Sequence, residues 1–219
     1  MAKIYSTKPF LLLLYGYPGA GKTYFARQFC ENVHAAHLQS DRIRSELFTK
    51  ALFDKQENAI VNQLMNYMSE EFLSAGLSVV YDVNAARSGQ RRVLADMAAR
   101  CHAQTLVVWF QMDPDTAFDR SIGRDRRRSD DKYAAEWDRT TYETLTERMQ
   151  NPTRNENYVV VSGKHLFPTQ QSAVLSKLRS LGIVSTDDSS SRVVKPGMVN
   201  LIPNNAGRVN LSRRNIFIR

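Results

Sequence analysis

Residues 16–23 read Gly16-Tyr17-Pro18-Gly19-Ala20-Gly21-Lys22-Thr23, which fits the pattern Gly-x-x-x-x-Gly-Lys-Ser/Thr of a phosphate-binding P-loop, the Walker A motif. The segment before it, residues 10–15, is a short apolar run typical of a buried strand, and residues 24–29 are typical of a helix. In a strand, loop and helix of this order, backbone N–H groups and the helix dipole hold an oligophosphate. We therefore expect a nucleotide site here.

The last two residues of the loop have predicted roles of their own. Lys22 is expected to reach the β- and γ-phosphates of ATP, and the Thr23 hydroxyl is expected to ligate Mg2+. The whole segment 16–23 is therefore a predicted nucleotide contact. The alternative is an ordinary Gly-rich turn between a strand and a helix, but the complete motif with both flanks favours the nucleotide site.

The composition suits one compact domain with a sizeable core. The chain has 219 residues, of which 42% are hydrophobic and 24% are charged. No apolar run approaches the ~20 residues that span a bilayer, so no membrane partner is expected. Two lone cysteines, Cys30 and Cys101, give no disulfide framework and suit a reducing cytoplasm. The histidines lack metal-ligand spacing to carboxylates and are interpreted as structural; they are His34, His37, His102 and His165.

The net charge of +8 admits an anionic partner such as a nucleotide, a sugar phosphate or nucleic acid. Basic residues gather in two regions, residues 120–128 and residues 192–219. A solvated basic surface is the alternative interpretation of both regions.

Apolar runs alternate with helical patterns through about residue 182. This alternation predicts an α/β protein in which right-handed crossovers build a five-stranded parallel sheet covered by helices on both faces, the three-layer P-loop NTPase arrangement. The expected strands are residues 10–15, 36–39, 78–82, 105–110 and 158–161. The expected helices include residues 88–100, one starting at Asp113-Pro114, and a last one from about 166 to 182.

One further helix is expected between the second and third strands. Ile60, Leu64, Met68 and Phe72 recur every fourth residue, with Val61 and Met65 beside them, and this stripe is the predicted buried face of the helix. A methionine-rich binding groove is the alternative interpretation of the same stripe.

The chain is predicted to divide into a nucleotide-binding domain, residues 1–183, and a basic C-terminal extension, residues 184–219. Residues 185–191 are a polar linker. Small apolar groups recur in the extension, which favours partial packing against the domain over full disorder. Nucleic-acid docking and an oligomer contact are the competing interpretations.

Ser40-Asp41-Arg42-Ile43-Arg44 directly follows the second predicted strand. The carboxyl ends of parallel strands open on the ligand crevice, so Asp41 is expected near the γ-phosphate. A carboxylate there accepts a proton from an attacking hydroxyl, which makes Asp41 the predicted general base. If a helix starts here, Arg44 lies about one turn further on and faces the same crevice as a substrate contact. The alternative is a capping aspartate with a solvated arginine.

The third predicted strand ends in an acid and an amide, Asp82 and Asn84. Its end should lie beside the P-loop, as in a Walker B strand. Asp82 is expected to hold a Mg2+-bound water or to brace the loops, so Thr23 and Asp82 form the predicted metal site. Asp82 and Asn84 are also candidate substrate contacts. The alternative for Asp82 is a cap at the strand end.

Arg120 and Arg124 are four residues apart in the helix predicted to start at Asp113-Pro114, so they should share one face. Residues 126–128, all arginine, continue into a polar stretch. We interpret this region as a lid that carries arginines over the phosphates, where a guanidinium neutralises the charge of the transferring group. Arg124 is the first candidate for catalysis and Arg120, a nucleotide contact, is the second. The remaining arginines are solvated or contact an anionic substrate.

Four motifs in this order resemble the polynucleotide-kinase-like P-loop kinases, a group of small AAA-type ATP-binding kinases related to zeta toxins and chloramphenicol phosphotransferase. They are the P-loop, the Asp-x-x-Arg of residues 41–44, the Asp-x-Asn of residues 82–84 and the Arg-x-x-x-Arg of residues 120–124. The resemblance covers about residues 10–182. It implies a five-stranded parallel core, ATP with Mg2+ and phosphorylation of a hydroxyl. The implied roles are phosphate and metal binding by Lys22 and Thr23, base catalysis by Asp41, substrate contact by Arg44 and lid function for Arg124.

Two functions from different classes remain open at this point. The first is an ATP-dependent kinase whose acceptor hydroxyl belongs to a polynucleotide 5′ end or to a small molecule. The second is a nucleotide-dependent switch or adaptor, with the basic extension binding nucleic acid or a partner. No Asn-Lys-x-Asp guanine signature occurs, which disfavours a GTPase-like switch.

Overall fold

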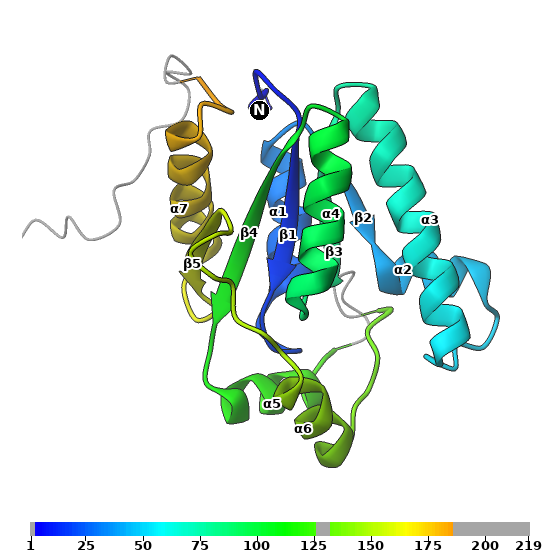
Figure 1. The fold of residues 1–219 in the computed structure, drawn as a ribbon. Helices are drawn as coiled ribbons and strands as arrows, with labels where there is room; N and C mark the ends of the chain where they lie inside the picture. The colour runs from blue at the N-terminus through cyan, green and yellow to red at the C-terminus, as the bar shows by residue number, and fades with distance from the viewer. Residues whose placement is uncertain (1–2, 126–131, 186–219) are drawn as a thin grey trace, which may run out of the picture.

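A computed structural model describes residues 3–125 and 132–185, which form a five-stranded sheet of order β2-β3-β1-β4-β5 (Figure 1). Every neighbouring pair of strands is parallel. The strands are β1 (Phe10–Tyr15), β2 (Ala35–Gln39), β3 (Ser78–Asn84), β4 (Gln104–Gln111) and β5 (Tyr158–Ser162). The predicted α/β fold of the P-loop NTPase type is confirmed.

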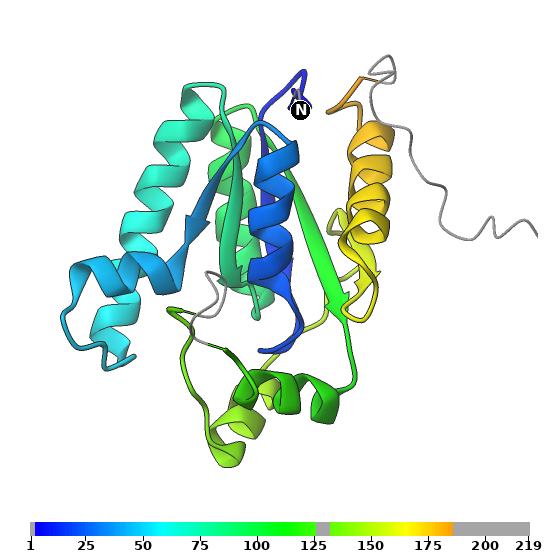
Figure 2. The same ribbon diagram turned by 180° about the vertical axis from the view of Figure 1, so that it is seen from behind.

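Helices cover both faces of the sheet. Figure 2 shows α1 and α7 on one face, and Figure 1 shows α3 and α4 on the other. The helices are α1 (Lys22–Asn32), α2 (Ser40–Leu47), α3 (Lys55–Ser74), α4 (Ser88–Arg100), α5 (Pro114–Ile122), α6 (Arg139–Glu147) and α7 (Phe167–Ser180). None of the helices in the described ranges is long and apolar enough to cross a membrane.

The central strand β1 is apolar throughout because both of its faces are buried. Leu12 and Leu14 belong to the core under α1 and α7, whereas Leu11 and Leu13 belong to the core under α3 and α4. Full burial of a leucine side chain stabilises a fold by roughly 1.5–3 kcal/mol. A continuous apolar run at this position therefore ties the two cores to one strand and fixes the start of the P-loop.

The buried face of α3 overlaps with the predicted stripe. Val61, Met65 and Leu73 are buried, and Met68 and Phe72 are half-buried against the same core. The prediction is wrong at Ile60, which is 47% exposed because packing against β3 selects the neighbouring face of the helix.

The lid region also departs from expectation. Helix α5 ends at Ile122, so Arg124 lies beyond it and does not share a helical face with Arg120. Gly123 ends the helix, because its N–H bonds to the Asp119 carbonyl as the C-cap. The arginines at 126–128 lie outside the described residues, as does most of the predicted linker and extension. Ile183 and Val184 are both buried in the core, and the division of the chain after residue 183 stays a prediction.

Candidate active site

The P-loop joins β1 to α1 through glycines in a backbone conformation that residues with a side chain rarely adopt. Gly21 precedes α1 with φ +89°, and Gly19 has φ +87°. A Cβ on Gly19 would lie 2.0 Å from the carbonyl oxygen of Ala117 in α5. The loop therefore needs glycine here both for its turn and for the close approach of the lid helix.

Lys22 opens α1 with its ammonium turned back over the loop. Its Nζ donates to the carbonyl oxygens of Gly16, at 2.7 Å, and Tyr17, at 2.9 Å. Burial lowers the pKa of Lys22 to about 8, with Asp82 acting in the opposite direction. The ammonium is thus held against the backbone of the predicted phosphate-binding loop.

Thr23 and Asp82, the two predicted metal ligands, lie in contact, and their role in holding a metal stays a prediction. The Thr23 hydroxyl lies 3.3 Å from Oδ1 of Asp82, which is buried near the end of β3. Oxygen donors of this kind suit Mg2+, which retains waters and binds through one or two protein groups plus substrate phosphates. In residues 3–125 and 132–185, no group of three or more His, Cys, Asp or Glu is arranged to hold a metal ion.

Asn84 braces the start of the P-loop. Its Oδ1 accepts a hydrogen bond from the Gly16 N–H at 3.3 Å, and its amide nitrogen lies 3.8 Å from the sulfur of Met149. The pairing of β1 with β3 shifts register just before Asn84, so that Leu14 lies opposite it. Such an irregularity re-aims side chains at a strand end. A substrate contact by Asn84 stays a prediction.

Asp41 lies in the first turn of α2, directly after β2. Burial, together with the nearby charge of Asp82, raises the pKa of Asp41 to about 6, while Arg44, Arg124 and Lys22 act in the opposite direction. A carboxyl with a pKa near 6 is ionised at neutral pH and is more basic than an ordinary aspartate. It therefore has the character of a general base.

Arg44 does not face open solvent or an open crevice. It is 5% exposed, and its guanidinium donates to Oε2 of Glu57 at 3.0 Å and to Oδ1 of Asn58 at 2.6 Å. It also lies 4.6 Å from the centre of the Phe53 ring. Its buried Nε has no hydrogen-bond partner among the described residues. Arg44 thus joins α2 to α3, and its predicted contact with substrate is untested.

Glu57 fixes this corner of the site from the α3 side. It accepts hydrogen bonds from the N–H groups of Leu52 and Phe53, both at 2.9 Å. Burial acts to raise the pKa of Glu57, but these N–H groups and Arg44 outweigh it, so the pKa is lowered. The segment before α3 is therefore held in place by a charged acceptor, which also supports the φ of +56° at Phe53.

The two candidate arginines contact different parts of the lid. Arg120 donates to the Gly163 carbonyl at 2.9 Å, which ties α5 to the loop after β5. Arg124 donates to the Ala135 carbonyl at 3.2 Å. Arg124 also acts electrostatically on the pKa of both Lys22 and Asp41.

A cavity of about 510 Å3 adjoins the P-loop. Its walls come from three places: residues 19–24, Arg120 with residues 123–125 and Ala134, and residues 163–167 with Gln170. The third set was not predicted. The position of residues 163–167 directly after the last strand could have identified them, because the carboxyl ends of parallel strands share one crevice.

His37 is a second residue that sequence reasoning missed. Its Nε2 lies 3.0 Å from Oδ2 of Asp82. The sequence signal is its position on the predicted second strand. Residues two apart in a strand point to the same face of the sheet, so His37 can face the same side as the end of a neighbouring third strand. The interpretation of all four histidines as structural therefore overlooked this contact.

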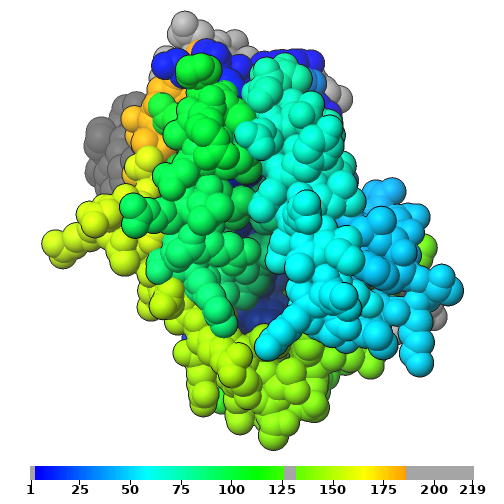
Figure 3. Space-filling view, turned by 45° about the vertical axis from the view of Figure 1, so that its right-hand side comes forward, coloured from blue at the N-terminus to red at the C-terminus, as the bar shows by residue number. Residues whose placement is uncertain are grey.

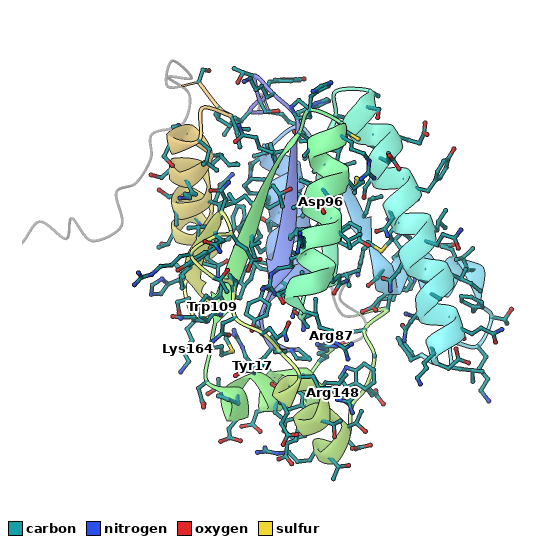
Figure 4. All side chains as sticks on the ribbon, in the orientation of Figure 1. Tyr17, Arg87, Asp96, Trp109, Arg148 and Lys164 are labelled. Atoms are coloured by element: carbon teal, nitrogen blue, oxygen red, sulfur yellow. The ribbon has the colours of Figure 1, made fainter. Side chains whose placement is uncertain are left out.

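A hollow lies on the side of α3 and α4. Figure 3 shows a hollow between α3, α4 and α6, at whose base the deep blue segment containing β1 and the P-loop is visible. Figure 4 shows Tyr17, Arg87 and Arg148 between the lower end of the sheet and helices α5 and α6. Gln150 holds these segments together, since its N–H bonds to the Ala86 carbonyl at 2.8 Å.

Comparison with known proteins places the sequence in a family. The profile of the family described as AAA domain matches residues 11–152, well over half of the chain. No curated protein matches the sequence significantly.

Several solved structures share the fold at low sequence identity. A gluconokinase from Sinorhizobium meliloti 1021 is 16% identical with a TM-score of 0.56, and the match covers 80% of this chain and 94% of that chain. Kti12 from Chaetomium thermophilum, in complex with ADP-AlF3, is 17% identical with a TM-score of 0.60, covering 80% and 100%. The APS kinase CysC from Mycobacterium tuberculosis, in complex with AMPPNP and APS, is 15% identical with a TM-score of 0.58, covering 78% and 98%.

Proposed function

Because the chain belongs to the AAA domain family, we propose that it is an ATP-dependent kinase that transfers the γ-phosphate of ATP to a hydroxyl group. The observation that carries the proposal is the position of Asp41. It starts α2 at the carboxyl end of β2. Burial raises its pKa, and the nearby charges of Arg124 and Lys22 partly offset that rise. Phosphate transfer to an acceptor hydroxyl needs a base near the phosphate-binding lysine, whereas nucleotide binding alone does not need one.

Binding of ATP is assigned to the P-loop and the adjoining cavity. Backbone N–H groups of the loop, to which Pro18 contributes none, hold the β- and γ-phosphates, and the Lys22 ammonium adds a positive charge. Thr23 and Asp82 would hold Mg2+, which supplies neutralisation of phosphate charge when bound. The cavity bounded by Arg120 and residues 163–167 receives the nucleoside part.

In the transfer step, Asp41 accepts the proton of the acceptor hydroxyl. The acceptor oxygen forms a bond to the γ-phosphorus while the bond from that phosphorus to the β–γ bridging oxygen breaks, and ADP leaves. Lys22 and Arg124 stabilise the negative charge spread over the transferring group. General-base catalysis of this kind contributes typically 10²–10⁴-fold in rate.

The acceptor is proposed to enter through the hollow between α3, α4 and α6 (Figure 3). Asp41, Arg44 and Asn84 lie on this side of the phosphates in the proposal. A 5′-hydroxyl of a polynucleotide and a small hydroxyl compound both remain candidates. The names gluconokinase and APS kinase among the structural neighbours favour a small molecule, while the net charge of +8 favours a polyanion. A specific relation to polynucleotide kinases stays a prediction.

To test this, the protein is incubated with γ-³²P-ATP, Mg2+ and one of a panel of acceptors, and the product that carries the labelled phosphate is identified. The panel contains a 5′-hydroxyl oligonucleotide, nucleosides and monosaccharides. A kinase places label on one of these, whereas a nucleotide-dependent switch releases it only as inorganic phosphate. Acceptor binding is then measured between 50 and 200 mM salt. The binding of a polynucleotide acceptor weakens steeply over this range because its phosphates release counterions, whereas the binding of a small neutral acceptor stays nearly constant.

A further inference from the structure

The hydrogen bond between His37 and Asp82 has no part in the transfer step described above. His37 Nε2 lies 3.0 Å from Oδ2 of Asp82, and the Asp82 side chain is 4% exposed. An ionised carboxylate only accepts hydrogen bonds, so the imidazole presents its Nε2–H. The bond occupies one carboxylate oxygen, while the other, Oδ1, lies 3.3 Å from the Thr23 hydroxyl.

The parallel register of β2 and β3 creates this contact. His37 pairs with Val80, and Gln39 pairs with Asp82. Residues two apart in a strand point to the same face, so His37 and Asp82 share the face on which Val80 packs under α1. Thr23 lies in the first turn of α1. Three elements therefore bring one donor and one hydroxyl to the two oxygens of a single carboxylate.

The surroundings of His37 separate this contact from ordinary packing. Its side chain is 20% exposed. Within the described residues, Asp82 is the hydrogen-bond partner of the imidazole and no other is present. Because the side chain is partly exposed, an apolar side chain of similar size would fit at this position while the donor would be lost.

We propose that His37 is a positioning residue for the metal site: it holds the Asp82 carboxylate so that Oδ1 faces Thr23, and thereby sets the affinity of the nucleotide complex for Mg2+. The inference rests on the proposed function and deepens it. Without the Nε2–H, the buried Oδ2 loses its hydrogen-bond partner, and an unsatisfied buried acceptor destabilises this arrangement. The carboxylate then turns toward other donors, of which the Lys22 ammonium acts electrostatically on Asp82 already.

The experiment compares H37L with H37Q in the full chain. Leucine removes the donor, whereas glutamine places an amide N–H near the position of Nε2. Isothermal titration of ATP is performed at a series of Mg2+ concentrations and in EDTA. We expect H37L to raise about tenfold the Mg2+ concentration at which ATP binding is half-maximally strengthened. This is the lower end of the range of effects on metal affinity when a group that orients a metal ligand is lost. ATP affinity in EDTA should be unchanged. H37Q should stay within twofold of wild type.

The matched control is H34L, because the His34 ring stacks on Tyr5 at 4.6 Å between ring centres and does not contact Asp82. It should leave the Mg2+ dependence unchanged. An H37L protein with wild-type Mg2+ dependence overturns the inference. If the wild-type protein binds ATP with no Mg2+ dependence at all, the proposed function fails and the inference with it.

A second measurement decides the matter if H37L does not fold. In ¹⁵N-labelled wild-type protein at pH 8.5, NMR should show His37 as the Nε2–H tautomer, and the D82N substitution should move its ring nitrogen signals. A predominant Nδ1–H tautomer would overturn the inference, because Asp82 would then receive no hydrogen bond from the ring.

Discussion

The Thr23 hydroxyl lies 3.3 Å from Oδ1 of Asp82 and links the start of α1 to the end of β3. The two residues are 59 positions apart in the chain. Their meeting joins the P-loop, which holds phosphate, to an acidic strand end suited to a metal ion. The same strand end raises the pKa of Asp41, so one carboxylate influences both the proposed metal site and the proposed base.

Replacement of Lys22 by methionine should remove nucleotide binding. The ammonium is the only flexible positive group of the motif, and the loop carbonyls already hold it at the mouth of the loop. We expect K22M to weaken ATP binding at least about 100-fold, that is by more than roughly 2.7 kcal/mol, measured by titration calorimetry. The control K55M alters an exposed lysine at the start of α3 and should bind ATP normally. Wild-type affinity in K22M would refute the assignment.

The raised pKa of Asp41 has a consequence for stability. The folded pKa of about 6 exceeds the unfolded value of about 3.9, so the folded protein holds the proton more tightly. The contribution of Asp41 to stability is therefore full below pH 4 and is lost as the pH rises through 6. D41N should be more stable than wild type at pH 7.5, by roughly 1–2 kcal/mol in urea unfolding, and this gain should shrink at pH 4. An equal gain at both pH values would contradict the argument.

The contact between the P-loop and α5 predicts a large effect at Gly19. G19A combines an unfavourable φ with a Cβ placed 2.0 Å from the Ala117 carbonyl oxygen. We expect a loss of at least about 2 kcal/mol in unfolding free energy together with weaker ATP binding. Gly89 in α4 has open space around it, so G89A should be neutral or stabilising by roughly 0.5–1 kcal/mol. Equal behaviour of the two variants would contradict the placement of α5.

Arg91 should be among the most sensitive positions for stability. It is 2% exposed and donates to the carbonyls of Ala85, at 2.8 Å, and Gln150, at 2.9 Å, and to Oε1 of Glu156, at 3.0 Å. Loss of one partner of a buried ion pair costs roughly 3–5 kcal/mol, so R91L should unfold at much lower urea concentration. The adjacent exposed arginine gives the control R92L, expected within about 0.5 kcal/mol of wild type.

Much of this architecture is predictable from the sequence, because the β1 and β3 runs and the P-loop are local signals. Each of the five strands was expected at its place, with ends that differ by at most two residues. The side chain of Arg44 was not predictable in the same way. The helical spacing predicts the position of Arg44 along α2. The burial of its side chain, however, depends on Glu57 and Asn58, which lie in α3.

The contacts that sequence reasoning missed are all between elements distant in the chain. His37 pairs with Asp82 only through the register of β2 and β3, and residues 163–167 reach the cavity only because β5 lies beside β4. Arg124 was expected on a helical face with Arg120, but Gly123 ends the helix between them. Local patterns predict elements well, whereas side-chain partners depend on tertiary packing.

Single-turnover transfer from γ-³²P-ATP, measured for wild type and D41N at saturating Mg2+, tests the assignment of Asp41 most directly. With the acceptor that takes label from the panel, we predict that wild type forms labelled acceptor and that D41N is slower by about 10²–10⁴-fold, while both bind ATP equally well. Transfer by D41N at the wild-type rate, or label found only in inorganic phosphate with every acceptor of the panel, would contradict a kinase that uses Asp41 as its base.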